Sequence, residues 1–369
     1  MIAFRVASSI TEIDRDPWNA CFPGKLEDYD YLLAVEQAGL AGFDWRYVVV
    51  EEYGKIVAAT PGFLTAYALD STLTGAQKTI MRWLRAAFPK MLTPRLACLG
   101  SPCTETGGVG IAREGLGLNR MSLLAGMVQA FEVHADREGC ALVGVKDIAE
   151  PEQPAWEQAL GKDRFEGVPG LPVATLDIDF PNIDAYLARL SRPTRSDMRR
   201  KLRSRAQLRI ERRHDLAGIR DRIMLLYRQT RARAEMQFED LPATYFDGVL
   251  AAMGERAFMV LYYAGDELLA ANLLLHDRTT LLDKFFCMDA ERGRAHNLYF
   301  VSWFENLSYC LAHGLKHYQS GQAAYANKLR LGSRLTRTQM YFRHRNRIFD
   351  RALRLAAPLL APEPAPRTK

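Results

Sequence analysis

The sequence lacks any run of about 18 consecutive apolar residues, the length that a membrane-spanning helix requires. Its first 16 residues contain neither a basic leader nor a sustained apolar run, so they do not resemble a signal peptide. Cysteine is scarce, with six in 369 residues, and the six are scattered rather than grouped as metal ligands. These absences predict a cytoplasmic protein with reduced thiols, no bound metal and no membrane span.

Short motifs of several enzyme classes are also missing. The chain has no G-x-S-x-G, no P-loop and no H-E-x-x-H. His313 and His317 are four residues apart, but Gly314 interrupts the helix and no third ligand stands near. The glycine-rich stretch 104–110 carries no basic residue, which favours a plain turn over a pyrophosphate-binding loop.

The length favours two domains rather than one. Residues 150–173 are rich in proline and glycine around one short helix, as is typical of a domain boundary. We therefore predict an N-terminal domain over 1–175 and a C-terminal, catalytic domain over 176–360. The proline-rich end, 361–369, is predicted to be a flexible tail.

Hydrophobic patterning predicts the same kind of architecture in both halves. In the first half, strands at 45–51 and 56–64 flank Gly54, and helices follow at 77–87 and 119–136. In the second half, a meander of three strands lies between 258 and 288, and a helix follows it. The predicted fold class is α/β (α+β), with two tandem domains that each have a mixed, mostly antiparallel sheet flanked by helices.

Positive charge is concentrated in two stretches. Residues 192–213 contain ten Lys/Arg and two acids, and residues 328–354 contain nine Lys/Arg and one acid. The other 320 residues hold 30 bases and 40 acids, although the whole chain has a net charge of +6. This asymmetry indicates a binding site for a polyanion.

Two passages, 190–211 and 284–338, resemble Fem-type aminoacyltransferases and their acetyltransferase-fold (GNAT-like) relatives. The first has the Thr-Arg and Arg-Arg-Lys pattern of a helix that leads into a strand. The second resembles the closing section of peptidoglycan biosynthesis or recognition proteins, and its matching positions are Gly321, Lys328, Leu329, Gly332 and Thr336 to Thr338. Where those relatives have a glutamate-histidine pair before the lysine, this chain has Ala326-Asn327, and His344 is displaced from their histidine.

The resemblance implies a tandem acetyltransferase fold that forms an amide bond. The co-substrate would be an acyl-CoA-type thioester or an aminoacyl-tRNA, with no permanently bound cofactor. The acceptor would be an amine on a small molecule or peptide, and tRNA is a possible partner. The position of Lys328 in the resemblance, just after a glycine-bearing strand-to-loop turn, makes it the first catalytic candidate, with an oxyanion or a donor phosphate to neutralise. We expect this lysine to be exposed, and a solvated lysine on a helix is the alternative.

Amide formation also needs a group that keeps the attacking amine neutral. Asp283 and Glu305 are the candidate bases, together with Asp289, and a solvated place on the outer face of a strand is the alternative for Asp283. Tyr299, Tyr318 and Tyr325 are candidates for an acyl or acceptor pocket, although such aromatic residues also fit a core.

Arg195, Arg199 and Arg203 follow a four-residue spacing, with Met198 and Leu202 predicted to face inward. Arginine forks match phosphate geometry, so this row is the predicted donor-binding or phosphate-binding surface. A solvated helix face is the alternative.

Arg330 and Gly321 are added to the donor-binding set. Gly321 lies in the loop that precedes Lys328, and Arg330 follows that lysine by two residues.

Three functions remain in competition. An N-acyltransferase that uses a thioester is favoured by a small margin. The nineteen Lys/Arg of the two basic stretches exceed what coenzyme A needs, but many are expected on outward faces, and the net charge of −10 elsewhere would repel RNA. An aminoacyl-tRNA-dependent transferase in cell-wall or natural-product biosynthesis is the second. A nucleic-acid-binding protein that has lost catalysis is the third, although the basic stretch 192–213 contains no aromatic residues for stacking on single strands.

Overall fold

The chain forms two compact units in this computed structural model, which describes residues 2–67, 93–112, 119–161, 164–234 and 238–360. The first unit contains the described residues up to 172, the short stretch 238–240 and the described chain from 337 onward. The second unit contains the other described residues between 173 and 336. The predicted helix at 77–87 and the predicted tail at 361–369 lie outside the described residues.

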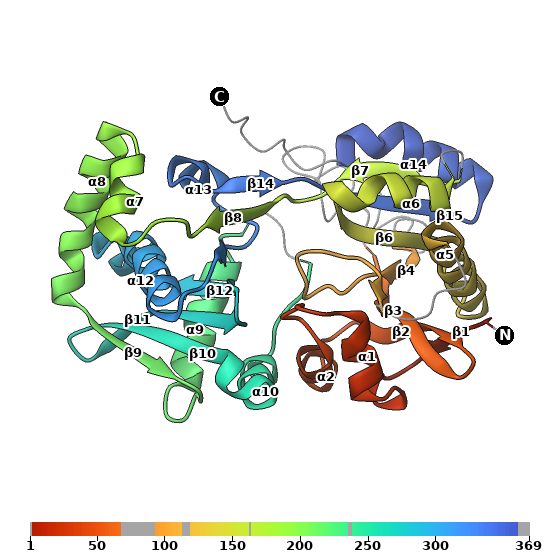
Figure 1. Cartoon of the computed structure of the whole chain (residues 1–369), viewed down its shortest axis with the longest axis horizontal. Helices are drawn as coiled ribbons and strands as arrows, with labels where there is room; N and C mark the ends of the chain where they lie inside the picture. Colours follow the sequence, from red (N-terminus) through yellow and green to blue (C-terminus); the bar gives the residue numbers. More distant parts are fainter. Residues whose placement is uncertain (1, 68–92, 113–118, 162–163, 235–237, 361–369) are drawn as a thin grey trace. The chain divides into compact units, whose positions relative to one another are not determined.

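The first unit is built on an eight-stranded sheet (Figure 1). Its order is β1 (Ile2–Ala7), β2 (Phe43–Glu52), β3 (Lys55–Ala66), β4 (Arg95–Leu99), β6 (Leu142–Ala149), β15 (Thr338–His344) and β7 (Glu166–Pro169), with β5 (Gly110–Ile111) beside β3. All pairings along this order are antiparallel except that of β4 with β6. The predicted hairpin is confirmed, and its two-residue turn, Tyr53-Gly54, has positive φ at both positions, as a type I′ turn requires.

Helices cover both faces of this sheet. Alternate residues of β2 point to opposite sides. Val48 and Val50 belong to the core under α5 (Arg120–Arg137) and α6 (Gln153–Leu160). Tyr47 faces the other side, where its ring lies 5.6 Å from that of Trp18 in α1 (Arg15–Cys21). The α2 helix (Tyr29–Gln37) packs beside α1.

The chain returns to the first unit after Thr336. β15 inserts between β6 and β7, and α14 (Arg347–Leu360) packs on β7 and β15. The second predicted domain, 176–360, differs from this division, because residues 337–360 belong to the first unit. The local sequence pattern did not predict that residues 337–360 belong to the first unit, because strand pairing over such a distance depends on tertiary contacts.

The second unit has a seven-stranded sheet. Its order is β14 (Arg334–Thr336), β8 (Val173–Asp177), β13 (His317–Gln319), β12 (Thr280–Met288), β11 (Glu267–His276), β10 (Ala257–Ala264) and β9 (Arg209–Arg213). The predicted meander is confirmed as β10, β11 and β12. Only β12 and β13 pair in parallel among these neighbours.

Strand alternation in the second unit also creates two buried faces. Val260 and Tyr262 of β10 face the core formed with α7 (Ile183–Arg189), α8 (Arg192–Leu202) and α12 (Leu298–His313). On the other face, the ring of Phe285 lies 5.0 Å from that of Tyr227 in α9 (Arg220–Arg231) and 6.1 Å from that of Phe246 in α10 (Ala243–Met253).

The two units share one supersecondary motif. β4, α5 and β6 in the first unit repeat as β12, α12 and β13 in the second, and each motif joins two parallel strands through a helix. The expectation of two mainly antiparallel sheets flanked by helices is therefore confirmed. None of the described helices is long and apolar enough to cross a membrane.

Candidate functional site

A cluster of buried polar side chains lies between α12 and the parallel strands β12 and β13 of the second unit. Asp283 has the same orientation as Leu281 in β12 and therefore points to the α12 side of the sheet. A bulge follows, because Leu274 pairs with Asp283 whereas Leu273 pairs with Phe285. Bulges re-aim side chains and are frequent next to active sites.

Asp283, Tyr318 and Asn306 form a closed triangle of hydrogen bonds. The Tyr318 hydroxyl donates to Asp283 Oδ2 over 2.9 Å, and Asn306 Nδ2 approaches the same oxygen at 3.2 Å. Asn306 Nδ2 also donates to the Tyr318 hydroxyl over 2.9 Å. The carboxylate of Asp283 in β12 is thus fixed by side chains from α12 and from the neighbouring strand β13.

The environment of Asp283 makes it a better base than a solvated aspartate. Burial raises the pKa of Asp283 from 3.8 to about 6, against the opposing effects of the Tyr318 hydrogen bond and the Lys328 charge. A carboxyl group with this pKa is still largely ionised near neutral pH. It can accept a proton more readily than an ordinary carboxylate.

Several buried polar atoms around this carboxylate have no hydrogen-bond partner in the described part of the chain. They are Asn306 Oδ1 and the hydroxyl groups of Tyr262 and Tyr299. The Asn272 amide lies near enough to Asp283 to lower the pKa of this carboxyl group, so it serves the carboxylate itself. Buried polar groups are normally paired, so a concentration of unpaired ones indicates a place where water or a ligand binds.

Lys328 is buried, with 4% of its surface exposed, which corrects the expectation of an exposed lysine. Its Nζ donates to the carbonyl oxygens of Ser320 and of Gly321, the latter at 2.9 Å. The reason is local: Gly321 (φ 77°) and Ala324 (φ 55°) both have left-handed backbones. These turns fold α13 (Tyr325–Arg330) back on the end of β13.

The structure brings four predicted residues to one place, namely Asp283, Tyr318, Tyr299 and Lys328. Tyr318 bonds Asp283 directly, and the charges of Lys328 and Asp283 interact. Burial and the charge of Asp283 raise the pKa of Tyr299. Tyr325 belongs to the Lys328 side of the cluster, with its ring 6.0 Å from Lys328 Nζ.

The other two candidate bases have separate partners. Glu305 forms an ion pair with Arg205 in the short helix η3 (Arg203–Gln207). Besides burial, the charge of Glu305 raises the pKa of Tyr262, and the charge of Asp283 does the same. Asp289 accepts hydrogen bonds from the backbone N–H groups of Glu291 and Arg292, so it holds a turn.

The predicted arginine row divides into one structural and two exposed residues. Met198 and Leu202 face the core, as predicted. Arg195 donates to the carbonyl oxygens of Ala188 and Leu190 at the end of α7. Arg199 and Arg203 are exposed, and neither side chain makes a hydrogen bond or ion pair with another described residue.

Arg330 is held by α8 rather than left open. It pairs with Asp197 and donates to the Thr194 hydroxyl over 3.3 Å. Burial alone would raise the pKa of Asp197, but hydrogen bonds from Arg330, Arg200 and Lys201 hold that pKa well below its ordinary value. Arg330 therefore connects α13 to α8 through these contacts.

Basic residues follow the length of α12 from the α8 side. Lys201 Nζ lies 3.6 Å from the centre of the Phe300 ring. Ser204 accepts a hydrogen bond from Asn297 over 2.9 Å, and Arg205 pairs with Glu305. The basic passage 195–205 thus lies along the helix that carries Asn306.

The histidine pair and the glycine-rich loop, which the sequence analysis discounted as ligand sites, make contacts within the protein. His313 Nδ1 contacts the Tyr309 carbonyl and His317 Nδ1 contacts Asp177 Oδ1. Among the described residues, no group of three or more His, Cys, Asp or Glu side chains is placed to hold a metal. In the loop 104–110, the carbonyl oxygen of Thr104 instead accepts a hydrogen bond from half-buried Lys146 at 3.0 Å.

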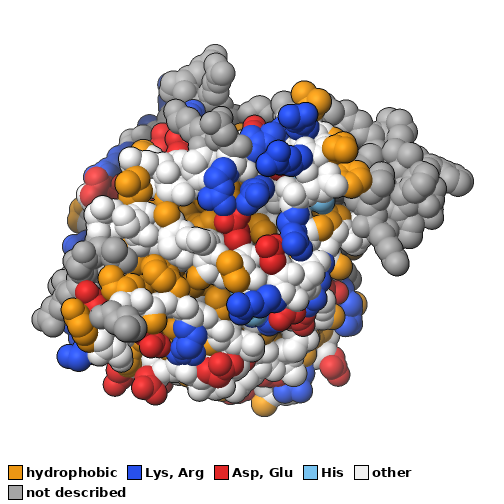
Figure 2. Space-filling view, turned by 90° about the vertical axis from the view of Figure 1, so that its right-hand side faces the viewer, with side chains coloured by type: hydrophobic (Ala, Val, Ile, Leu, Met, Phe, Trp, Pro, Cys, Tyr) orange, Lys and Arg blue, Asp and Glu red, His pale blue; other side chains and the backbone are white. Residues whose placement is uncertain are grey.

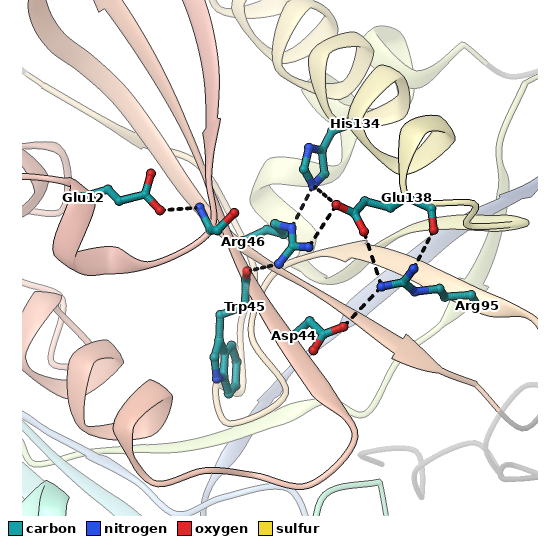
Figure 3. Close-up of polar contacts among 8 residues, drawn as sticks. Glu12, Asp44, Trp45, Arg46, Arg95, His134 and Glu138 are labelled. Carbon is teal, nitrogen blue, oxygen red and sulfur yellow. Dashed lines mark hydrogen bonds and ion pairs between the residues drawn. The ribbon is translucent and has the colours of Figure 1, made fainter.

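The first unit contains a polar network of its own (Figure 3). Arg46 Nε donates to His134 Nε2 over 2.7 Å, and Arg46 pairs with Glu138 at 3.3 Å. Arg95 connects Glu138 to Asp44. These residues pair with one another, and so the network ties β2, β4 and α5 together.

Asn272, Asn306 and Tyr262 are members of the site that the sequence did not single out. Asn272 stands alone in the apolar strand ELLAANLLLH, and Asn306 lies on a buried face of α12. A polar residue inside an apolar strand is costly unless it has a use. This interruption of the apolar pattern was the signal available.

Comparisons with known proteins agree with this geometry. A profile of the FemAB-like family, described as peptidoglycan biosynthesis/recognition, matches residues 9–356. No curated protein sequence matches the chain.

Solved structures share the fold over most of the chain. FemX is 14% identical, with a TM-score of 0.60 over 95% of this chain and 100% of that one. A tandem GNAT protein from the clavulanic acid biosynthesis pathway is 12% identical, with a TM-score of 0.53 over 93% and 98%. The C-terminal domain of a putative lysylphosphatidylglycerol synthetase from Agrobacterium fabrum is 12% identical, with a TM-score of 0.52 over 95% and 96%. The tandem GNAT-like fold is thereby confirmed, and the chain belongs to the FemAB-like family of peptidoglycan biosynthesis and recognition proteins, as an amide-forming transferase of the acyl or aminoacyl type.

Proposed function

We propose that the protein transfers an aminoacyl group from tRNA to an amine of a peptidoglycan precursor, with Asp283 as the general base. The observation that carries this proposal is the partly buried carboxylate of Asp283, held by Tyr318 and Asn306 beside unpaired polar groups. Family membership supplies the class of reaction.

In the proposed reaction, the acceptor nitrogen attacks the carbonyl carbon of the aminoacyl ester. A C–N bond forms while the carbonyl oxygen becomes an oxyanion, and the surplus proton on nitrogen passes to the Asp283 carboxylate. The intermediate then collapses, the ester C–O bond breaks, and the departing ribose hydroxyl takes that proton. General base catalysis of this kind contributes about 10²–10⁴ in rate.

The donors for the oxyanion are proposed among the unpaired groups. The hydroxyl groups of Tyr262 and Tyr299 lie in the cluster and make no hydrogen bond with described residues. They can therefore bind a developing negative charge without first breaking a bond, as preorganised donors do.

Lys328 is proposed as a positioning residue instead of an oxyanion donor. Its ammonium already bonds two carbonyl oxygens at the end of β13. Through these bonds it fixes the loop 320–324 next to Tyr318, and its charge lowers the pKa of Asp283. This role keeps the lysine essential without contact with the reacting atoms.

Two features favour tRNA over a thioester as the donor, which reverses the order that the sequence alone suggested. The family is one of peptidoglycan biosynthesis and recognition. In addition, Arg199 of α8 and Arg203, which follows this helix, are exposed in a passage with more basic groups than the phosphates of coenzyme A require. The site itself argues against a catalytically silent nucleic-acid-binding protein, because binding alone needs no partly buried base.

The test is an amide-forming assay with aminoacyl-tRNA and acyl-CoA as alternative donors and a muramyl-peptide precursor as acceptor. Asp283→Asn should lower kcat/KM by about 10³ with tRNA as donor, whereas Asp266→Asn, in the exposed β10–β11 turn, should not. Undiminished turnover of Asp283→Asn would remove this residue as the base. Turnover with acyl-CoA but not with aminoacyl-tRNA would overturn the donor.

A further inference from the structure

Helix α14 of the first unit directs its ion pairs toward the sheet and apolar side chains toward solvent. Asp350 Oδ1 accepts from the His344 backbone N–H over 2.8 Å, and Asp350 Oδ2 accepts from Arg354 Nε over 2.8 Å. Arg354 also pairs with Glu166 of β7 at 3.4 Å. A surface helix normally has the opposite arrangement, with its apolar stripe on the core.

The outward face of α14 carries two large aliphatic side chains. Ile348 is 76% exposed and Leu355 is 83% exposed. They stand seven residues apart, or about two helical turns, so they lie on one side of the helix. We call these two residues, with Arg347 and Arg351, the α14 face.

Arg347 and Arg351 have no partner within the described chain. Both are exposed, and neither side chain forms an ion pair or hydrogen bond with another described residue. Arg343 and Arg345, just before the helix, are paired with Glu132 and Asp136 of α5.

Residues 343–355 contain five arginines and a single acid, which is the inward Asp350. Figure 2 views the side of the molecule on which Figure 1 places α14, and it shows Lys and Arg side chains gathered in the upper part of this face, with apolar side chains beside them.

We propose that the α14 face binds an anionic lipid bilayer, with Ile348 and Leu355 in the acyl boundary and Arg347 and Arg351 at the headgroups. Helices that lie in a membrane interface combine a strongly basic polar side with an exposed apolar one. Arginines within a Debye length of an anionic surface each strengthen binding by about fivefold.

A second copy of the chain fits this face less well. In a symmetric dimer the same patch meets itself, which would bring Arg347 and Arg351 close to the same residues of the partner. Like charges at an interface suppress association, whereas an anionic bilayer neutralises them.

This surface lies in the first unit and the proposed catalytic cluster lies in the second, so the two inferences are tested separately. Activity on a water-soluble acceptor should not change when the α14 face is altered. Loss of activity in Asp283→Asn should not change lipid binding.

The experiment is flotation of the whole protein with vesicles of phosphatidylcholine, either pure or containing about one third phosphatidylglycerol. Two paired variants are compared with the wild type: Ile348→Ser with Leu355→Ser, and Arg347→Gln with Arg351→Gln. The matched controls are Leu225→Ser, an apolar residue 39% exposed on α9, and Arg278→Gln, an exposed arginine in the β11–β12 turn.

The wild type and both controls should float with anionic vesicles and bind pure phosphatidylcholine much more weakly. Each paired variant should reduce anionic-vesicle binding by about tenfold or more, with an unchanged thermal transition, because only exposed side chains are altered. Equal binding of the wild type and both paired variants would overturn the proposal, as would absence of vesicle binding. A dimer in sedimentation equilibrium that the Ile348→Ser, Leu355→Ser variant loses, without vesicle binding by the wild type, would assign the face to self-association.

Discussion

The hydroxyl of Tyr318 donates a hydrogen bond to Asp283 Oδ2 over 2.9 Å, across the only parallel strand pair of the described second-unit sheet. This bond stabilises the ionised carboxylate and so lowers the pKa of Asp283, while burial raises it. The balance between the two effects places the carboxylate near pKa 6, where it is both ionised and basic at neutral pH.

Tyr318→Phe should therefore shift the pH–rate profile upward. With the wild type, kcat should rise with pH through a midpoint of about 6 as Asp283 loses its proton. Removal of the hydroxyl removes a bond that favours the ionised form, so the midpoint should move to higher pH and part of the rate should return in alkaline buffer. The control is Tyr263→Phe, because the side chain of Tyr263 lies on the face of β10 opposite to that of Tyr262. An unchanged midpoint in Tyr318→Phe would contradict the assignment.

Lys328→Met should lower both turnover and stability. The variant leaves the carbonyl oxygens of Ser320 and Gly321 without their donor, which costs about 2 kcal/mol in the free energy of unfolding. It also removes a charge that lowers the pKa of Asp283, so its pH–rate midpoint should rise as well. Denaturant unfolding and pH profiles measure the two effects.

Lys316→Met is the matched control, since Lys316 is exposed in the same unit. A Lys328→Met protein with wild-type stability would show that the buried ammonium contributes nothing to the loop 320–324. Lower stability with a wild-type pH midpoint would leave Lys328 with a purely structural role.

Much of the fold was accessible from the sequence because its strands and helices are strongly patterned. The meander of β10, β11 and β12 and the helix α12 fall where alternation and helical periodicity place them. β15 was not predicted, although its residues alternate, because its partners β6 and β7 are far away in the sequence and its own passage is strongly basic. Pairing of this kind depends on packing that no local window contains.

The site was accessible in part for a similar reason. Asp283 and Tyr318 were chosen by chemistry and resemblance, and the parallel pairing of β12 with β13 then places them together. The burial of Lys328 was not foreseen, because it depends on the left-handed backbone of Ala324, a residue type that seldom adopts it. Asn272 and Asn306 are recognised as site residues only in the structure, where Asn306 bonds Asp283 and Tyr318 and Asn272 lowers the pKa of Asp283.

Salt dependence distinguishes phosphate-binding arginines from structural ones. Arg199→Ala and Arg203→Ala should each weaken tRNA binding and lower the slope of log affinity against log salt by somewhat under one unit, because each phosphate contact releases counterions. Arg278→Ala removes an equal charge from the exposed β11–β12 turn and should leave the slope unchanged. Binding would be measured from about 50 to 300 mM salt.

Arg195→Ala is informative in a different way. Its side chain bonds the carbonyl oxygens at the end of α7, so its replacement should lower the free energy of unfolding by about 1 kcal/mol.

In the salt titration, equal slopes of log affinity against log salt in Arg199→Ala, Arg203→Ala and Arg278→Ala would contradict a tRNA surface on α8.

The first unit should have a pH-dependent stability that arises at His134. Its Nε2 accepts a hydrogen bond from Arg46 Nε over 2.7 Å, so the ring is neutral in the folded state. Burial, followed by the charge of Arg46, lowers the pKa of His134 below 6.5. The unfolded chain therefore binds a proton more readily, and stability must fall as pH decreases.

The contribution of His134 to the free energy of unfolding should have its full value above about pH 6.5 and should decline as the pH falls below 6.5. His134→Gln keeps an acceptor oxygen near the place of Nε2 but cannot be protonated, so the variant should lose this part of the pH dependence. Denaturant titrations between about pH 5 and 8 compare the two proteins, and the relevant quantity is the difference between their curves. That difference should change below pH 6.5 and stay constant above it, because Arg46 loses its acceptor and meets a like charge only when the histidine is protonated. Parallel curves over the whole range would show that the Arg46–His134 bond does not control the stability of this unit.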